Sequence, residues 1–112
     1  MPLLSSAATW KKLPLTLMPY ELRFKTEAVK EWDKLGATVR AQFKKKLAER
    51  LNAPHVPAAR LSGSVARYKI KLSTAGFRLV YEVRDAELVV VVIAVGKRER
   101  GHVYRKAQQR YD

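Results

Sequence analysis

The stretch YKIKLSTAGFRLVYEV, residues 68–83, decides the fold, because polar and apolar side chains alternate on both sides of a short turn. Alternation with a period of two is typical of strands that bury one face, and Ser-Thr-Ala-Gly at 73–76 is typical of a turn. The sequence therefore predicts a β-hairpin with residues 74 and 75 at its tip. The pairs predicted on its apolar face are Leu72 with Phe77, Ile70 with Leu79, and Tyr68 with Tyr81.

The opposite face of this hairpin collects positive charge. The same register places Lys71 directly across from Arg78, with Lys69 one pleat away, because cross-strand partners share a face. A slip by one residue would bury these charges, so the register is well specified. Like charges opposite each other destabilise a sheet, and no carboxylate in the pattern neutralises them. We therefore predict that a polyanion, namely RNA, occupies this face.

A second hairpin extends the sheet. Residues 84–87 are typical of a turn, and the apolar run LVVVVIAV, residues 88–95, predicts a central strand that is covered on both faces. Pairing Val83 with Leu88 aligns Arg78 with Ile93. The chain leaves this strand as GKRER, residues 96–100, at the end of the sheet that carries the first three cations. Arg98 is therefore predicted to reach the same site.

The remaining elements follow from periodicity and end signals. Residues 20–24 alternate as a first strand, residues 52–65 form a loop, and residues 103–110 form a last helix. Thr26 is the predicted N-cap of a short helix that ends at Gly36, and Thr38 that of a longer helix closed by Pro54. The predicted inner faces of the two helices comprise Ala28, Trp32 and Leu35, and Val39, Phe43, Leu47 and Leu51. The order βααβββα predicts one small α+β domain with a mostly antiparallel sheet.

Composition limits the possible functions. A chain of 112 residues with 47% hydrophobic residues provides one domain, and its net charge of +13 favours a phosphate backbone or an acidic protein as partner. The absence of cysteine excludes thiol catalysis and cysteine-ligated zinc and fits a reducing cytoplasm. No apolar stretch approaches the roughly 20 residues of a membrane span, so no membrane partner is expected.

The first 17 residues differ from the rest of the chain. They contain two prolines, no acidic residue and no helical or strand periodicity. Their two lysines follow the apolar part, which is unlike a signal peptide. We interpret residues 1–17 as a disordered extension, an upstream start or an added segment, and residues 18–112 as the folded domain.

Several motifs together resemble the RelE family of bacterial toxins from type II toxin–antitoxin modules. The resemblance covers Met18 to about Arg110. The motifs, in chain order, are AVKEW (28–32), KLG (34–36), KKKL (44–47), YKIKL (68–72), GFRLVY (76–81) and VGKRER (95–100) followed by Val103 and Tyr104. The family's compact sheet with packed helices agrees with the order of elements predicted above.

The resemblance implies an endoribonuclease that cuts messenger RNA in the A site of the 70S ribosome, without metal or cofactor, and that a RelB-like antitoxin silences. Carried over residue by residue, it implies a functional set that is complete in this chain. The set comprises Lys69, Lys71, Arg78, Arg98 and Tyr104. The chain departs from the family at residues 1–17 and at the Gly101-His102 pair before Tyr104.

Cleavage of RNA without a metal has definite chemical requirements. The ribose 2′-hydroxyl attacks the adjacent phosphate, which needs a base for its proton, cations for the phosphate charge and an acid for the leaving oxygen. No His or Glu is predicted within the cationic face, and neighbouring cations favour the neutral form of a lysine. We therefore hypothesise that Lys71 is the base, with Lys69 as the alternative, and that the planar guanidinium of Arg78 clamps the phosphate.

By family analogy Arg98 assists the leaving group, for which charge stabilisation fits better than acid catalysis because arginine rarely gives up its proton. Tyr104 is expected to stack on or orient the target nucleotide, and its alternative role is to pack the last helix. Contacts to RNA or the ribosome are expected from further basic residues, for which a solvated surface is the alternative. These are Arg40, Lys44, Lys45, Arg50, Lys97 and Arg100.

Two other classes of function remain open from the residues. In a non-catalytic module that binds RNA or the ribosome, the same cations hold phosphates and nothing is cut. Such modules expose aromatic residues for stacking, whereas Tyr68, Phe77 and Tyr81 are predicted on the core face. A degenerate toxin retained only to bind its antitoxin is the third possibility. His55 and His102 have no ligand-like neighbours, so no metal site is predicted.

Overall fold

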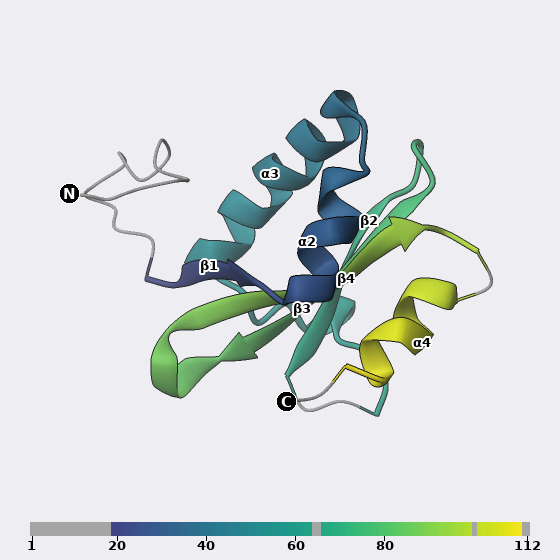
Figure 1. The fold of residues 1–112 in the computed structure, drawn as a ribbon. Coiled ribbons are helices and arrows are strands. Elements are labelled where there is room, and N and C mark those ends of the chain that lie inside the picture. Colours follow the sequence, from purple (N-terminus) through teal and green to yellow (C-terminus); the bar gives the residue numbers. More distant parts are fainter. Residues whose placement is uncertain (1–18, 64–65, 100, 111–112) are drawn as a thin grey trace.

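A computed structural model describes residues 19–63, 66–99 and 101–110. Residues 1–17, predicted as an extension, lie outside the described residues. The described chain forms a four-stranded sheet in the order β1-β4-β3-β2, with α2 and α3 on one face and α4 on the other (Figure 1). The elements are β1 (Glu21–Phe24), α2 (Thr26–Asp33), α3 (Ala37–Asn52), β2 (Arg67–Leu72), β3 (Phe77–Arg84), β4 (Val89–Lys97) and α4 (His102–Gln108), with 3₁₀ turns at Pro57–Ala59 and Asp85–Glu87.

The predicted α+β class and the order of elements are confirmed. Strand β1 runs parallel to β4, and the other two strand pairs are antiparallel. The first hairpin has the predicted register, with Leu72 opposite Phe77 and Lys71 opposite Arg78. Strand β4 is central, and every residue from Val89 to Val95 is buried, as the apolar run predicted.

The predicted register of the second hairpin is wrong. Val83 pairs with Val90 rather than with Leu88, because Asp85–Glu87 forms a 3₁₀ turn and Leu88 closes it in the left-handed region with a φ of 54°. Val80 pairs with Ala94 while Tyr81 pairs with Val92, so Ile93 is the extra residue of a β-bulge. Together the longer turn and the bulge place Arg78 opposite Gly96 instead of Ile93.

The two predicted N-caps are also wrong. Lys25 and Gly36 occupy the N-cap positions of α2 and α3 with extended backbones, and neither caps its helix through a side chain. Thr26 and Thr38 lie inside the first turns, one and two residues beyond the observed N-caps. The helices are held by burial instead, because Ala28, Phe43, Leu47 and Leu51 pack on the face of the sheet that carries Tyr68 and Tyr81.

Candidate functional site

Three of the predicted site residues share the sheet face that α4 covers. Lys69 and Lys71 lie on β2, and Arg78 lies opposite Lys71 on β3. Val80 follows Arg78 on this face and packs against α4. Lys71 is exposed, while Lys69 and Arg78 are partly buried. The Arg78 guanidinium donates to the carbonyl of Phe77 at 3.0 Å, which leaves most of its donors for other partners.

The bulged strand β4 brings Arg98 to the same end of the sheet. Lys97 pairs with Phe77, and the backbone N–H of Arg98 donates to the carbonyl of Gly76 at 2.8 Å. Gly76 closes the first hairpin turn with a φ of +72°, a conformation that favours glycine. The chain carrying Arg98 is therefore tied to the turn beside Arg78, and the Arg98 side chain is exposed.

Tyr104 reaches this face from α4. Its side chain is partly buried and packs against the cluster that contains Val80 and Ala94. Helix α4 packs close to β4 at Gly96, where an added Cβ would lie 3.4 Å from Val103 Cγ2, in van der Waals contact. Lys69, Lys71 and Arg78 thus share one sheet face, Arg98 follows the end of β4 beside the Gly76 turn, and Tyr104 packs on the same sheet face from α4.

A small cavity adjoins Tyr104, and the sequence analysis did not predict it. Its volume is about 260 Å³, below the usual size of ligand clefts, which starts at about 300 Å³. The loop before β2 contributes to it, and the only signal in the sequence was a Ser-Gly pair in a predicted loop. The lining residues are Leu61, Ser62, Gly63, Arg67, Tyr104, Ala107 and Gln108.

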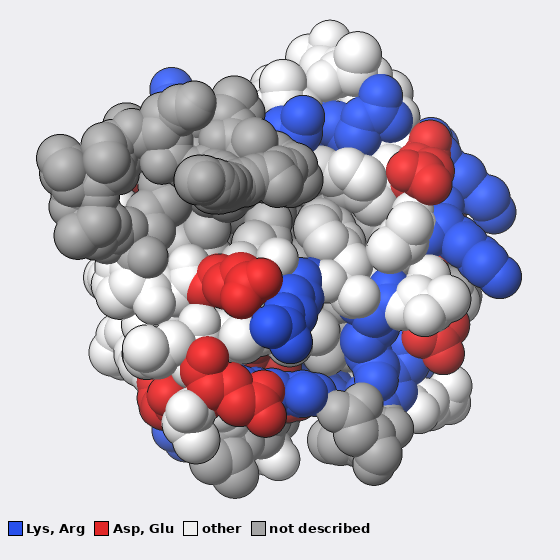
Figure 2. Space-filling view, turned by 60° about the vertical axis from the view of Figure 1, so that its left-hand side comes forward, with Lys and Arg blue, Asp and Glu red and all other residues white. Residues whose placement is uncertain are grey.

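The four cations of the site carry uncompensated charge. Within the described parts of the chain, none of them forms an ion pair with a carboxylate. Glu82 lies on the same sheet face but is engaged by Arg67 at 2.9 Å and by Arg84 at 2.8 Å. Figure 2 shows, from another side, Lys and Arg gathered toward one side of the view with a few acidic residues among them. A cluster of this charge can bind an anion.

The remaining basic residues predicted to contact RNA or the ribosome divide into two groups. Lys44, Lys45 and Lys97 are exposed, whereas Arg100 lies outside the described residues. Arg40 donates to the carbonyl of Leu35 at 2.8 Å, and Arg50 donates to the Tyr81 hydroxyl at 2.8 Å. The last two arginines therefore have internal contacts, which the sequence analysis did not predict and which compete with RNA binding.

The described residues include no group of three or more His, Cys, Asp or Glu side chains that could hold a metal ion. His55 lies between two partners, with Nδ1 2.9 Å from the Tyr68 hydroxyl and Nε2 2.9 Å from an Asp85 carboxylate oxygen. These contacts tie the loop after α3 to the turn between β3 and β4. None of the described helices has the length and apolar character of a membrane span.

Two carboxylates should make the free energy of unfolding depend on pH. Burial alone would raise the pKa values of Glu31 and Glu82, but hydrogen bonds from Arg110 and Lys106, and from Arg84 and Arg67, outweigh it and lower both. A lowered pKa in the folded state gives stability that is present above the unfolded value and lost as pH falls through the folded one. We expect the free energy of unfolding to fall as pH drops below about 4.5.

Denaturant unfolding monitored at a series of pH values from about 6 to about 3 checks this expectation. The Glu82→Gln variant provides the control, because it cannot take up the proton and should show a smaller decrease over that range. A free energy of unfolding that stays constant over the range in the wild type would contradict it.

Comparison with known proteins agrees with this geometry. A family model described as the ParE toxin of the type II toxin–antitoxin system parDE matches residues 22–101. A putative RelE-like toxin protein of Escherichia coli is 50% identical over 93 residues, which cover 83% of this chain and 98% of that protein. The mRNA interferase toxin RelE of Escherichia coli strain K12 is 55% identical over the same coverage.

Solved structures give the same result. An arginine-to-alanine double variant of E. coli RelE in the free state matches with a TM-score of 0.78 and 51% identity, covering 84% of this chain and 99% of that chain. The toxin of the intact E. coli RelBE toxin–antitoxin complex matches with a TM-score of 0.70 and 56% identity, and the match covers 72% of this chain and 99% of that chain. The chain belongs to the family of ParE and RelE toxins of type II toxin–antitoxin systems.

Proposed function

We propose that this protein is a toxin that cleaves messenger RNA in the ribosomal A site, as a metal-independent endoribonuclease, and so inhibits translation. The single observation that carries the proposal is the register that puts Lys71 opposite Arg78 and ties the backbone of Arg98 to the adjacent turn, with no carboxylate among the described residues paired to these cations or to Lys69. A phosphodiester supplies the charge that this face lacks. The relatives named mRNA interferase RelE support the same reaction.

The reaction begins at the ribose 2′-hydroxyl. Lys71, which lies directly opposite Arg78, acts as the base that accepts the hydroxyl proton. Lys69, one pleat away, is the alternative base. The 2′-oxygen then attacks the adjacent phosphorus, and the fork of the Arg78 guanidinium binds two of the phosphate oxygens as negative charge develops on them.

The second half of the reaction is departure of the 5′-oxygen. Arg98 stabilises the charge on this oxygen, and its exposed position on the chain beyond β4 lets it reach a bound strand. Tyr104 presents a partly buried ring to the same face and stacks on the target nucleotide, which fixes the 2′-oxygen relative to the phosphorus. The departing 5′-oxygen takes a proton from water, and the products are a 2′,3′-cyclic phosphate and a 5′-hydroxyl.

The partners follow from the same proposal. The message is bound in the 70S ribosome, and exposed Lys44, Lys45 and Lys97, together with Arg100, contact ribosomal RNA in the cytoplasm. Related E. coli toxin structures include complexes with the antitoxin RelB and with a RelB peptide. We infer that a RelB-like antitoxin neutralises this chain in the same way.

Cleavage of one defined message, free or bound to programmed 70S ribosomes, tests this function. A lysine base and an arginine at the leaving group are poorly matched catalysts, so the ribosome must hold the message near in-line geometry. We expect cleavage on the ribosome to be faster than cleavage of the naked message by roughly 10³-fold or more. Equal rates on both substrates would contradict ribosome dependence, and binding to the ribosome without any cleavage would identify a non-catalytic module or a degenerate toxin.

A further inference from the structure

The outer edge of strand β4 lacks a strand partner just where the site begins. Strand β1 pairs with β4 only as far as Phe24 and Val92, and Lys25 donates its N–H to the carbonyl of Val92 at 3.0 Å. Among the described residues no strand continues this edge, and the Ile93 carbonyl and the Val95 N–H lie beyond its last pair with β1. Such groups need partners when they are buried.

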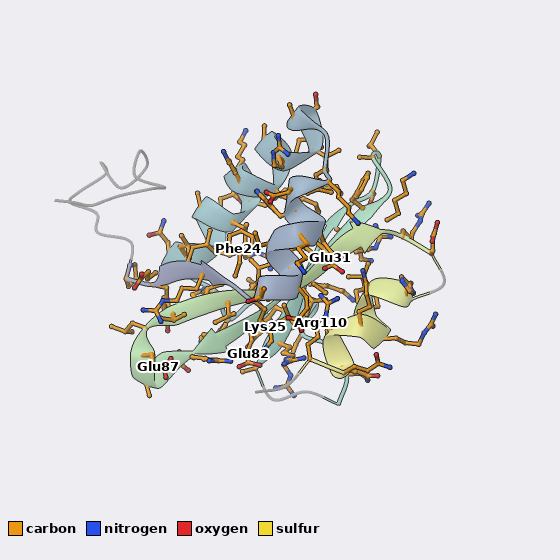
Figure 3. All side chains as sticks on the ribbon, viewed as in Figure 1. Phe24, Lys25, Glu31, Glu82, Glu87 and Arg110 are labelled. Carbon is orange, nitrogen blue, oxygen red and sulfur yellow. The ribbon has the colours of Figure 1, made fainter. Side chains whose placement is uncertain are left out.

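Glu31 and Arg110 provide those partners. A carboxylate oxygen of Glu31 on α2 accepts from the Val95 N–H at 3.2 Å, and the Arg110 guanidinium donates to the Ile93 carbonyl at 3.0 Å. The two side chains also pair with each other through two contacts of 2.9 Å (Figure 3). At the bulge, the backbone groups are therefore hydrogen-bonded by the two members of a bidentate ion pair rather than by a neighbouring strand.

The same carboxylate holds the last helix. Lys106 on α4 donates to Glu31 at 2.6 Å, so Glu31 contacts one residue within α4 and one just beyond it. From the other side, the Arg67 guanidinium donates to the carbonyls of Ala107 and Arg110. The C-terminal end of α4 is thus fixed on both sides, and two of the residues that fix it, Lys106 and Ala107, lie within one turn of Tyr104.

We propose that Glu31 is a positioning residue for the cleavage reaction, because it fixes both halves of the site. Through the bulge it holds the register that places Gly96 opposite Arg78 and sends Arg98 past the turn at Gly76. Through Lys106 and Arg110 it holds α4, which carries Tyr104. This positioning role rests on the proposed function, because the reaction it assists is the proposed cleavage of messenger RNA.

The geometry of the ion pair favours positioning over stability. The Glu31 and Arg110 side chains are only 18% and 15% exposed, so their attraction is offset in large part by the loss of hydration. A pair of this kind contributes little net stability compared with an apolar pair of similar size, but it requires one arrangement of its partners. The arrangement it requires here is the placement of β4 and α4 relative to each other.

The Glu31→Gln variant tests the role, because it keeps the shape and an oxygen acceptor while it removes the charge. We expect hydrogen exchange of the α4 amides to accelerate at least about tenfold, while amides of β2 and β3 keep their protection. The single-turnover cleavage rate at saturating programmed ribosomes should fall about 10- to 100-fold, with ribosome affinity changed less than about threefold. Glu31→Asp should recover part of the rate.

Two further variants separate this effect from general destabilisation. Asp33→Asn removes the same charge from an exposed residue of the same helix and should change neither exchange nor cleavage. Lys106→Met keeps the pairing of Glu31 with Arg110 and should produce a smaller change in both, which remains measurable even if Glu31→Gln does not fold.

The proposal is overturned if Glu31→Gln cleaves at the wild-type rate, whether or not α4 exchanges faster. It is also overturned if the loss of rate is accompanied by equal loss of protection throughout the sheet, since that would be a purely structural effect. A wild-type protein that never cleaves contradicts the proposed function instead, and hydrogen exchange then still reports whether Glu31 holds α4.

Discussion

Replacing Arg78 with alanine is expected to lower the single-turnover rate of message cleavage on ribosomes by about 100- to 1,000-fold, the usual effect of removing one donor to a developing oxyanion. Arg78 stands directly opposite the proposed base Lys71, and among the described residues its side chain donates only to the carbonyl of Phe77. Its other donors are therefore available to a phosphate. Stability should change little, because the variant removes a repulsive cross-strand pair.

The Arg23→Ala variant is the matched control. Arg23 is an exposed arginine on β1, the opposite edge strand, where it forms a surface ion pair with Glu21 at 3.3 Å. Both variants lose the same charge, so any general attraction to RNA falls equally in the two proteins. Cleavage by Arg23→Ala should stay within about threefold of the wild type. An Arg78→Ala variant no slower than Arg23→Ala would exclude Arg78 from the reaction.

The sequence allowed the first hairpin to be predicted correctly and the second only in part, for a physical reason. In the first hairpin polar and apolar residues alternate, so only one register buries Ile70 and Leu79 while exposing Lys71. Residues 89–92 are four identical valines, and a uniform strand gives no indication of where it pairs. The left-handed Leu88 and the bulge at Ile93 follow from turn closure and packing, which the side-chain pattern does not encode.

The cations of the site could be predicted because they lie on an alternating strand or directly after one. The residues that hold the site in place could not be predicted, because a charged residue on a helix is usually interpreted as a solvent-exposed surface residue. Glu31 did carry a signal, since it follows Ala28 by three positions and so shares the buried side of α2. Arg50 carried a similar one, since it follows the buried Leu47 by three positions. The partners of Glu31 lie 64 to 79 residues away in the sequence, and those of Arg50 lie 19 to 31 residues away. Helical periodicity does not predict contacts over such separations.

Removal of one 2′-hydroxyl from the message is expected to have the largest effect of all. The proposed reaction uses the hydroxyl on the 5′ side of the scissile phosphate as its nucleophile, and no residue of the site replaces it. The basic side chains of the site bind phosphate oxygens, so a 2′-deoxynucleotide should leave binding to the ribosome and protein unchanged. Loss of cleavage without loss of binding would thus separate the chemical step from recognition.

The most direct test uses a message with a single 2′-deoxynucleotide at that position, bound in the A site of programmed ribosomes. It asks whether the protein cleaves by attack of the ribose 2′-hydroxyl on the adjacent phosphate. The wild-type protein should cleave the all-ribose message to a 2′,3′-cyclic phosphate and a 5′-hydroxyl, and should not cleave the deoxy message at the modified position. Cleavage of the deoxy message at the same phosphate, with a 5′-phosphate on the product, would contradict the mechanism.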